Sequence, residues 1–80
     1  MLTKKEMNWV YNTIAKNKDI KEFHSEEKIN GVLYSMNVVR FPVLKDMFEF
    51  ALRKTSADKT YYIRGIVCVE FKAMFIQKSF

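Results

Sequence analysis

The residues of this sequence best suited to chemistry are cations that stand beside aromatic rings. Tyr62, Arg64 and Lys72 occupy even-numbered positions of one apolar-rich segment, TYYIRGIVCVEFKAMFIQ. Guanidinium and ammonium groups bind phosphate, and an aromatic ring stacks on a nucleobase. If these side chains share one face of a sheet, that face could bind nucleic acid. The alternative is an ordinary solvated face on which Glu70 pairs with a neighbouring cation.

Part of this segment, RGIVCVEF, is similar to the signature of RNA-recognition domains, Lys/Arg-Gly-aromatic-small-aromatic-Val-any-aromatic. The matching positions are Arg64, Gly65, Val69 and Phe71. Ile66 and Cys68, however, stand where that family carries the rings that stack on bases. The motif therefore does not indicate an RNA-recognition domain. The prediction of a binding face depends instead on Tyr62, Arg64 and Lys72.

Other cations flank Trp9 and the segment around residue 50. Trp9 has two interpretations: an exposed stacking or interface anchor beside Lys5 and Lys16, or one member of a broad core face. Lys54 precedes the segment TSADK and Lys59 ends it; we expect this segment to be a loop from which both lysines reach outward. The candidate nucleic-acid-binding residues are Lys4, Lys5, Trp9, Lys16, Lys18, Arg53, Lys54, Lys59, Tyr62, Arg64 and Lys72.

The composition favours a polyanionic partner. Fourteen Lys and Arg against nine Asp and Glu give a net charge of +5, which a small domain could also carry for solubility alone. Most of the cations are lysines, which are better suited to contacts with phosphate groups than to the recognition of individual bases. Aromatic residues make up 15% of only 80 residues, so surplus apolar surface is expected, and a homodimer would bury it.

The sequence offers no catalytic constellation. His24 is the only histidine, and we interpret it as a surface residue because its neighbour Ser25 would point to the opposite face of a strand. Glu26 and Glu27 are interpreted as a hairpin edge and not as a metal site, because no cluster of His, Asp and Glu joins them. Cys68 is the only cysteine, so the chain has neither a disulfide framework nor a thiolate zinc site of its own. We expect no enzyme activity, no catalytic residue, no metal and no cofactor.

Two helices are predicted. The first covers residues 4–17, with Thr3 and Glu6 in a capping-box pattern and apolar residues recurring at helical spacing behind them. The second lies in FPVLKDMFEFALRKT, with Pro42 at its first position and Arg53 and Lys54 at its end. Its apolar positions are 43, 44, 47, 48, 51 and 52, which form one wide helical face.

Strands are predicted for the remaining segments. Asn30-Gly31 lies between residues 20–29 and 32–41 and is a strong signal for a β-hairpin. The alternative for that region is a helix capped by Ser25, in which Gly31 would be unfavourable. Residues 60–77 alternate as one long strand, and Gly65 is a candidate bulge. The predicted fold is a single α+β domain over residues 1–80, in the order α-β-β-α-β, with two helices on a small sheet whose longest strand is C-terminal.

These observations predict a small, basic, non-enzymatic nucleic-acid-binding protein, with RNA favoured over DNA. In character the chain resembles the small accessory or anti-defence proteins of bacteriophages. The alternative is an inhibitor or adaptor that blocks a host enzyme or defence protein by direct contact. No apolar stretch approaches the roughly 20 residues of a membrane span, and no apolar run follows Lys4 and Lys5, so we expect no membrane partner and a place in the cytoplasm.

Overall fold

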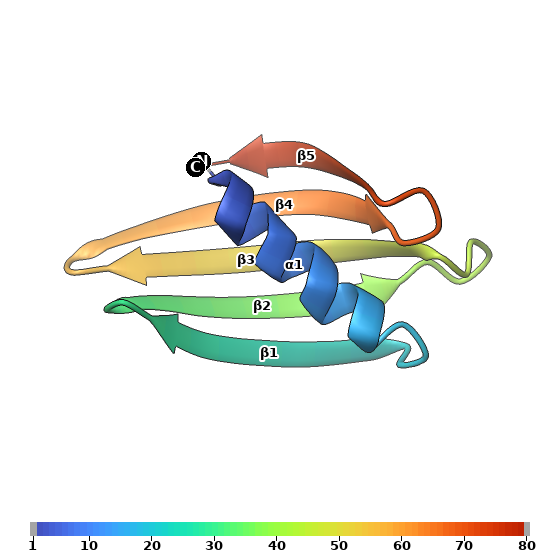
Figure 1. The fold of residues 1–80 in the computed structure, drawn as a ribbon, viewed down its shortest axis with the longest axis horizontal. Coiled ribbons are helices and arrows are strands. Elements are labelled where there is room, and N and C mark those ends of the chain that lie inside the picture. The colour runs from blue at the N-terminus through green and yellow to red at the C-terminus, as the bar shows by residue number, and fades with distance from the viewer. Residues whose placement is uncertain (1, 80) are drawn as a thin grey trace.

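The structure, a computed structural model that describes residues 2–79, is a helix lying on an antiparallel sheet (Figure 1). Its elements are α1 (Lys4–Lys16), β1 (Glu22–Ile29), β2 (Val32–Arg40), β3 (Met47–Ser56), β4 (Lys59–Cys68) and β5 (Ala73–Ser79). The five strands pair in chain order, and α1 crosses one face of the sheet diagonally. We call this the covered face and the opposite one, on which the described chain places no helix, the open face.

The first predicted helix is confirmed. The Glu6 backbone N–H donates to Thr3 Oγ1 at 3.2 Å, and the Thr3 N–H donates to Glu6 Oε1 at 2.7 Å, which completes the capping box. The helix ends at Lys16, one residue before the predicted end. Val10 and Ile14 are fully buried and turn the apolar stripe of the helix toward the sheet.

The hairpin at Asn30-Gly31 is also confirmed, so the alternative helix is wrong. Both residues have positive φ angles, 50° and 82°, which are the backbone angles of a tight two-residue hairpin turn. Ile29 pairs directly with Val32 across the turn. This turn fixes the register of β1 against β2 along its whole length.

The second predicted helix is wrong, because residues 47–56 form β3 and residues 41–46 form a loop. Phe48, Phe50 and Leu52 are buried in alternate positions, as a strand requires. The same stretch also satisfies helical spacing. Hydrogen bonds to β2 on one side and to β4 on the other satisfy the backbone polar groups of β3. The order of elements is therefore one helix followed by five strands, and not the predicted α-β-β-α-β.

The predicted long strand at residues 60–77 is divided into β4 and β5 by a turn, in which Lys72 has a φ of 52°. The longest strands are therefore β3 and β4, with 10 residues each, and not the C-terminal strand, which has 7. The TSADK segment is a tight turn at Ala57 and Asp58 between β3 and β4 rather than a loop.

Gly65 lies at an irregularity of the β4–β5 pairing, as predicted. The register shifts between Arg64 and Gly65. A Cβ atom at position 65 would lie 2.6 Å from the Phe75 carbonyl oxygen and 2.7 Å from the Phe50 ring. Glycine is required here because both Phe50 and the backbone of β5 approach β4 closely.

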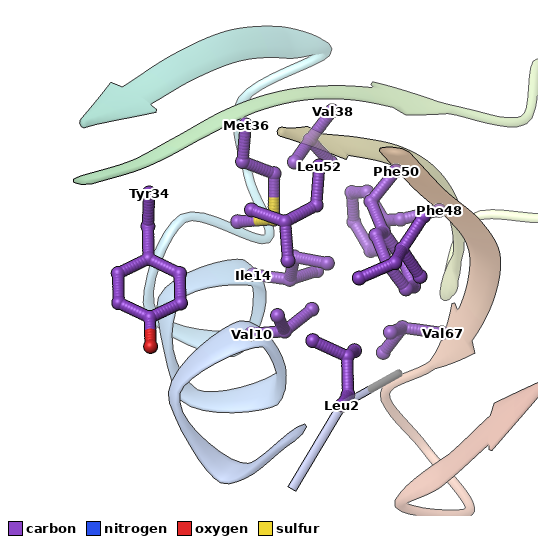
Figure 2. Packing of buried hydrophobic residues seen from close by; sticks show 11 residues of the cluster. Leu2, Val10, Ile14, Tyr34, Met36, Val38, Phe48, Phe50, Leu52 and Val67 are labelled. Carbon is purple, nitrogen blue, oxygen red and sulfur yellow. The ribbon is translucent and has the colours of Figure 1, made fainter. Parts of the chain in front are cut away.

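The core lies between α1 and the covered face (Figure 2). Val10 and Ile14 of the helix point toward side chains of β2, β3 and β4. The buried strand residues are Tyr34, Met36, Val38, Phe48, Phe50, Leu52, Ile63 and Val67. The alternate residues of the same strands point to the open face, where the candidate site is found.

Candidate nucleic-acid interface

A hollow of about 480 Å³ lies on the open face over β2, β3 and β4, with β1 at its border. Its centre is low because the side chains of Ser35, Asn37 and Ala51 are short. Longer polar side chains stand around them. The residues that line the hollow are His24, Ser35, Asn37, Ala51, Leu52, Arg53, Tyr62, Ile63 and Arg64.

Strand register brings three of the predicted binding residues together in this hollow. Arg53 of β3 lies directly opposite Tyr62 of β4, and Arg64 lies opposite Ala51. Arg53, Tyr62 and Arg64 are all exposed to solvent. Two guanidinium groups and one phenol ring are therefore available on the same surface.

His24 adds a titratable ring to the border of the hollow, and this ring is a cation when it is protonated. One ring nitrogen, Nδ1, lies 2.8 Å from Asn37 Oδ1, and the other, Nε2, lies 3.2 Å from Glu26 Oε2. Both contacts are with acceptors, so the ring donates from both nitrogens when it is protonated. The hydrogen bonds to Asn37 and Glu26 raise the pKa of His24 and favour the imidazolium form.

The arrangement around Ser35 does not suit nucleophilic catalysis. Its Oγ lies 3.4 Å from His24 Nε2, a distance that invites comparison with a serine–histidine pair. A general base needs an unprotonated nitrogen facing the hydroxyl. Here the same nitrogen faces the Glu26 carboxylate, which favours a proton on it. The polar groups of this cluster can offer hydrogen bonds to an anion or a polar ligand.

Carboxylates border the hollow without lining it. Among its lining residues within the described chain, none is an Asp or Glu. Glu49 lies beside it, with its Oε2 3.9 Å from Arg64 Nη2, and about half of each side chain is exposed. Exposed pairs of this kind contribute little energy. Arg64 can therefore exchange Glu49 for a phosphate group.

The predicted lysines of α1 lie away from the hollow. Lys4, Lys5 and Lys16 are exposed on the helix, and Lys18 is exposed in the turn that follows it. The helix lies over the covered face, so these four lysines cannot share one small ligand with Arg53 and Arg64. They form a second basic surface, which we call the helix lysines.

Lys54 points inward instead of outward. Its Nζ lies 2.6 Å from Glu6 Oε2, and the Tyr34 hydroxyl donates to the same oxygen at 2.6 Å. Lys54 is thus part of the attachment of α1 to the sheet. Lys59, at the first position of β4, is exposed beside the turn at Ala57-Asp58.

Trp9 and Lys72 also lie outside the hollow. Trp9 is half-buried, its ring centroid is 5.6 Å from that of Tyr34, and its Nε1–H donates to Glu27 Oε1 at 3.3 Å. This position agrees with the interpretation of Trp9 as part of a broad core face. Lys72 Nζ lies 5.9 Å from the centroid of the Tyr11 ring, at the end of the molecule where β4 turns into β5.

Sequence reasoning missed His24, Ser35 and Asn37 as lining residues. A signal for two of them existed, because the two-residue turn at Asn30-Gly31 fixes the register and places His24 opposite Asn37. The position of Arg53 opposite Tyr62 could not be read in the same way. It depends on β3, which the helical spacing concealed.

No protein-family model, curated protein or solved structure matches this chain. Within residues 2–79, no group of three or more His, Cys, Asp and Glu side chains is arranged to hold a metal ion. The helix in that range is too short and too polar to cross a bilayer. The geometry of the open face is therefore the basis for proposing a function.

Proposed function

We propose that the protein binds single-stranded nucleic acid, with RNA as its ligand, in the hollow of the open face. The observation that carries this proposal is the grouping of Arg53, Arg64 and His24 around a hollow whose described lining holds no carboxylate. Tyr62 stands exposed beside these cations. Cations that follow a phosphate backbone, together with a ring that accepts a base, are the general means by which proteins hold single strands.

In the proposed complex a phosphate binds between Arg53 and Arg64, and a base stacks on Tyr62. Ser35 and Asn37, at the centre of the hollow, offer hydrogen bonds to a base edge or to a ribose hydroxyl. The volume of about 480 Å³ falls within the range of small-ligand sites, roughly 300–1,000 Å³, and suits one nucleotide. A duplex keeps its bases stacked, so an unpaired strand fits this site better.

The first experiment measures the affinity of the nuclease-treated protein for a labelled oligouridine of about ten nucleotides, at several salt concentrations. Replacing Arg53→Gln and Arg64→Gln together should weaken binding by about tenfold or more at low salt. Each lost phosphate contact should also lower the slope of log affinity against log salt by about 0.7. Tyr62→Ala should weaken binding with little change in that slope, because a neutral ring is lost.

The matched control removes the same number of charges from the helix lysines, by Lys5→Gln and Lys16→Gln. We expect a loss of less than about threefold from this control, because those contacts would be non-specific. Equal losses from the two double variants would contradict a site in the hollow. The absence of binding to any single strand at low salt would contradict the function itself, and tighter binding to the DNA oligomer of the same sequence would contradict the assignment to RNA.

We extend the proposal to a biological role as an accessory or anti-defence factor of the bacteriophage type. Its ligand would then be an RNA of the host cell or of an invading element. Bacterial proteins that co-purify with the chain should be lost on nuclease treatment. Partners that survive nuclease treatment and bind the Arg53→Gln, Arg64→Gln variant equally well would favour the alternative, an inhibitor that acts by direct protein contact.

A further inference from the structure

Large apolar side chains are exposed at one end of the molecule. Val43 is 86% exposed, Phe71 76%, Leu44 52% and Ile20 46%. They belong to the loops that join α1 to β1, β2 to β3 and β4 to β5, and these three loops lie at the same end of the sheet (Figure 1). We call these loops, together with Lys16 at the end of α1 and Arg40 at the end of β2, the loop end; it comprises residues 16–21, 40–46 and 69–72.

Backbone hydrogen bonds hold the three loops against one another. The Arg40 N–H donates to the Lys21 carbonyl at 2.8 Å, and the Val69 N–H donates to the Asp46 carbonyl at 2.8 Å. The Tyr11 hydroxyl of α1 donates to the Val69 carbonyl at 2.8 Å. The loops are thus fastened to each other and to the helix, and their apolar side chains are held outward instead of folding over the core.

The loop end also carries much of the charge of the chain. It contains six cations and three anions, so more than half of the net charge of +5 lies on this end. The cations are Lys16, Lys18, Lys21, Arg40, Lys45 and Lys72, and the anions are Asp19, Asp46 and Glu70. Exposed aliphatic and phenyl groups surrounded mainly by lysines are typical of surfaces that bind an anionic partner with an apolar interior.

The size of this end distinguishes between possible partners. The molecule measures 38 × 20 × 19 Å with its long axis along the strands, so the loop end is one of its two narrow ends. A stable protein–protein interface buries about 800 Å² on each partner. Lysine is also depleted from protein interfaces. We therefore expect this narrow, lysine-rich end to suit a bilayer, which sets no minimum area, better than a second copy of the chain or another folded protein.

We propose that the loop end binds the surface of an anionic lipid bilayer. Val43, Leu44 and Phe71 insert among the headgroups, while lysines such as Lys18 and Lys45 lie against the lipid phosphates. This surface is distinct from the hollow and adds a second activity to RNA binding. The sequence predicted no membrane partner because it lacks a spanning segment, but insertion of loop side chains needs none.

The experiment is flotation of the nuclease-treated protein with vesicles of phosphatidylglycerol and phosphatidylcholine in equal parts, and with vesicles of phosphatidylcholine alone. We expect binding to the anionic vesicles to be at least tenfold stronger and to weaken as salt is added. Replacing Val43, Leu44 and Phe71 together by serine should reduce it by about tenfold or more. The matched control, Leu33→Ser with Tyr61→Ser, removes exposed apolar groups from the opposite end and should leave binding unchanged.

A second readout does not depend on the folding of the triple variant. The fluorescence of Val43→Trp should shift to shorter wavelength when anionic vesicles are added, and that of Leu33→Trp should not. The proposal is overturned if the anionic vesicles do not bind, if both vesicle types bind equally, or if neither Val43→Trp nor the triple variant responds. It is also overturned if light scattering shows a dimer that the triple variant abolishes, because a second copy would then cover the loop end.

Discussion

The two faces of the sheet differ although the same strands build them. In β3, Phe48, Phe50 and Leu52 point to the covered face and are buried under α1, whereas Ala51 and Arg53 point to the open face. Adjacent residues of one strand therefore serve different purposes. Substitutions on the covered face should change stability, and substitutions on the open face should change binding. Substitutions on each face test this separation.

The largest effect is expected from Phe50→Ala. The Phe50 ring is fully buried between β3, α1 and Gly65, and its removal should lower the free energy of unfolding by about 3–5 kcal/mol. Ala51→Ser, one residue further on the open face, should change it by less than about 0.5 kcal/mol. Urea unfolding followed by circular dichroism measures both. Similar losses from the two variants would contradict the division into a structural and a binding face.

The division between the faces was only partly visible in the sequence. The capping box at Thr3 and the hairpin turn at Asn30-Gly31 are local sequence patterns that each indicate one structure, and both predictions are confirmed. The segment around Phe50 is ambiguous, because the spacing of its apolar residues fits a helix as well as a strand. The apolar face of the predicted helix did not include Phe50, but in the strand this residue is fully buried in the core.

The turns that end β3 and β4 were not predictable from residue type. Ala57 and Lys72 both adopt positive φ angles, 54° and 52°, which glycine and asparagine usually supply. Without such a marker the segment from Thr60 to Gln77 looked continuous. The hollow was concealed for the same reason, since Arg53 and Tyr62 meet only when the turn at Ala57 joins two strands.

The next largest effect is expected from Gly65→Ala. The new methyl group would meet the Phe75 carbonyl oxygen and the Phe50 ring at less than 3 Å, so β5 or the ring must move. We expect a loss of about 1–3 kcal/mol, with faster hydrogen exchange in β5.

Gly31→Ala is the comparison for this substitution. A Cβ atom at position 31 meets nothing within 4 Å, and its cost of about 1 kcal/mol arises from the positive φ alone. Urea unfolding of both variants gives the two costs, and hydrogen exchange locates the change. A smaller cost at Gly65 than at Gly31 would show that β5 is loosely attached to β4.

A smaller, pH-dependent effect is expected at Glu6, which joins α1 to β2 and β3. Burial alone would raise the pKa of this carboxyl, but hydrogen bonds from Lys54, Tyr34 and the Thr3 backbone, with the charge of Lys54, lower it from 4.5 to about 2. The folded state therefore binds this proton less tightly than the unfolded chain. The stabilisation is complete above about pH 4.5 and is lost as the pH falls toward 2.

Glu6→Gln tests this contribution while it keeps the shape of the capping box. At pH 7 the variant should be less stable by about 1–2 kcal/mol, because Lys54 and Tyr34 lose a charged acceptor. The difference from the natural protein should shrink as the pH is lowered below 4.5. Thermal unfolding at several pH values measures it. A difference that stays constant with pH would mean that the carboxylate charge does not stabilise the contact.

The smallest effect on stability is expected from the double variant Arg53→Gln, Arg64→Gln. Both side chains are exposed, and the 3.9 Å contact of Arg64 with Glu49 is itself an exposed pair, so the free energy of unfolding should change by less than about 0.5 kcal/mol. The same variant is expected to lose nucleic-acid binding, so it separates the two faces most sharply. If urea unfolding showed a loss above about 1 kcal/mol, the open-face arginines would also be structural. A fall in RNA affinity could then reflect damage to the sheet instead of the loss of phosphate contacts.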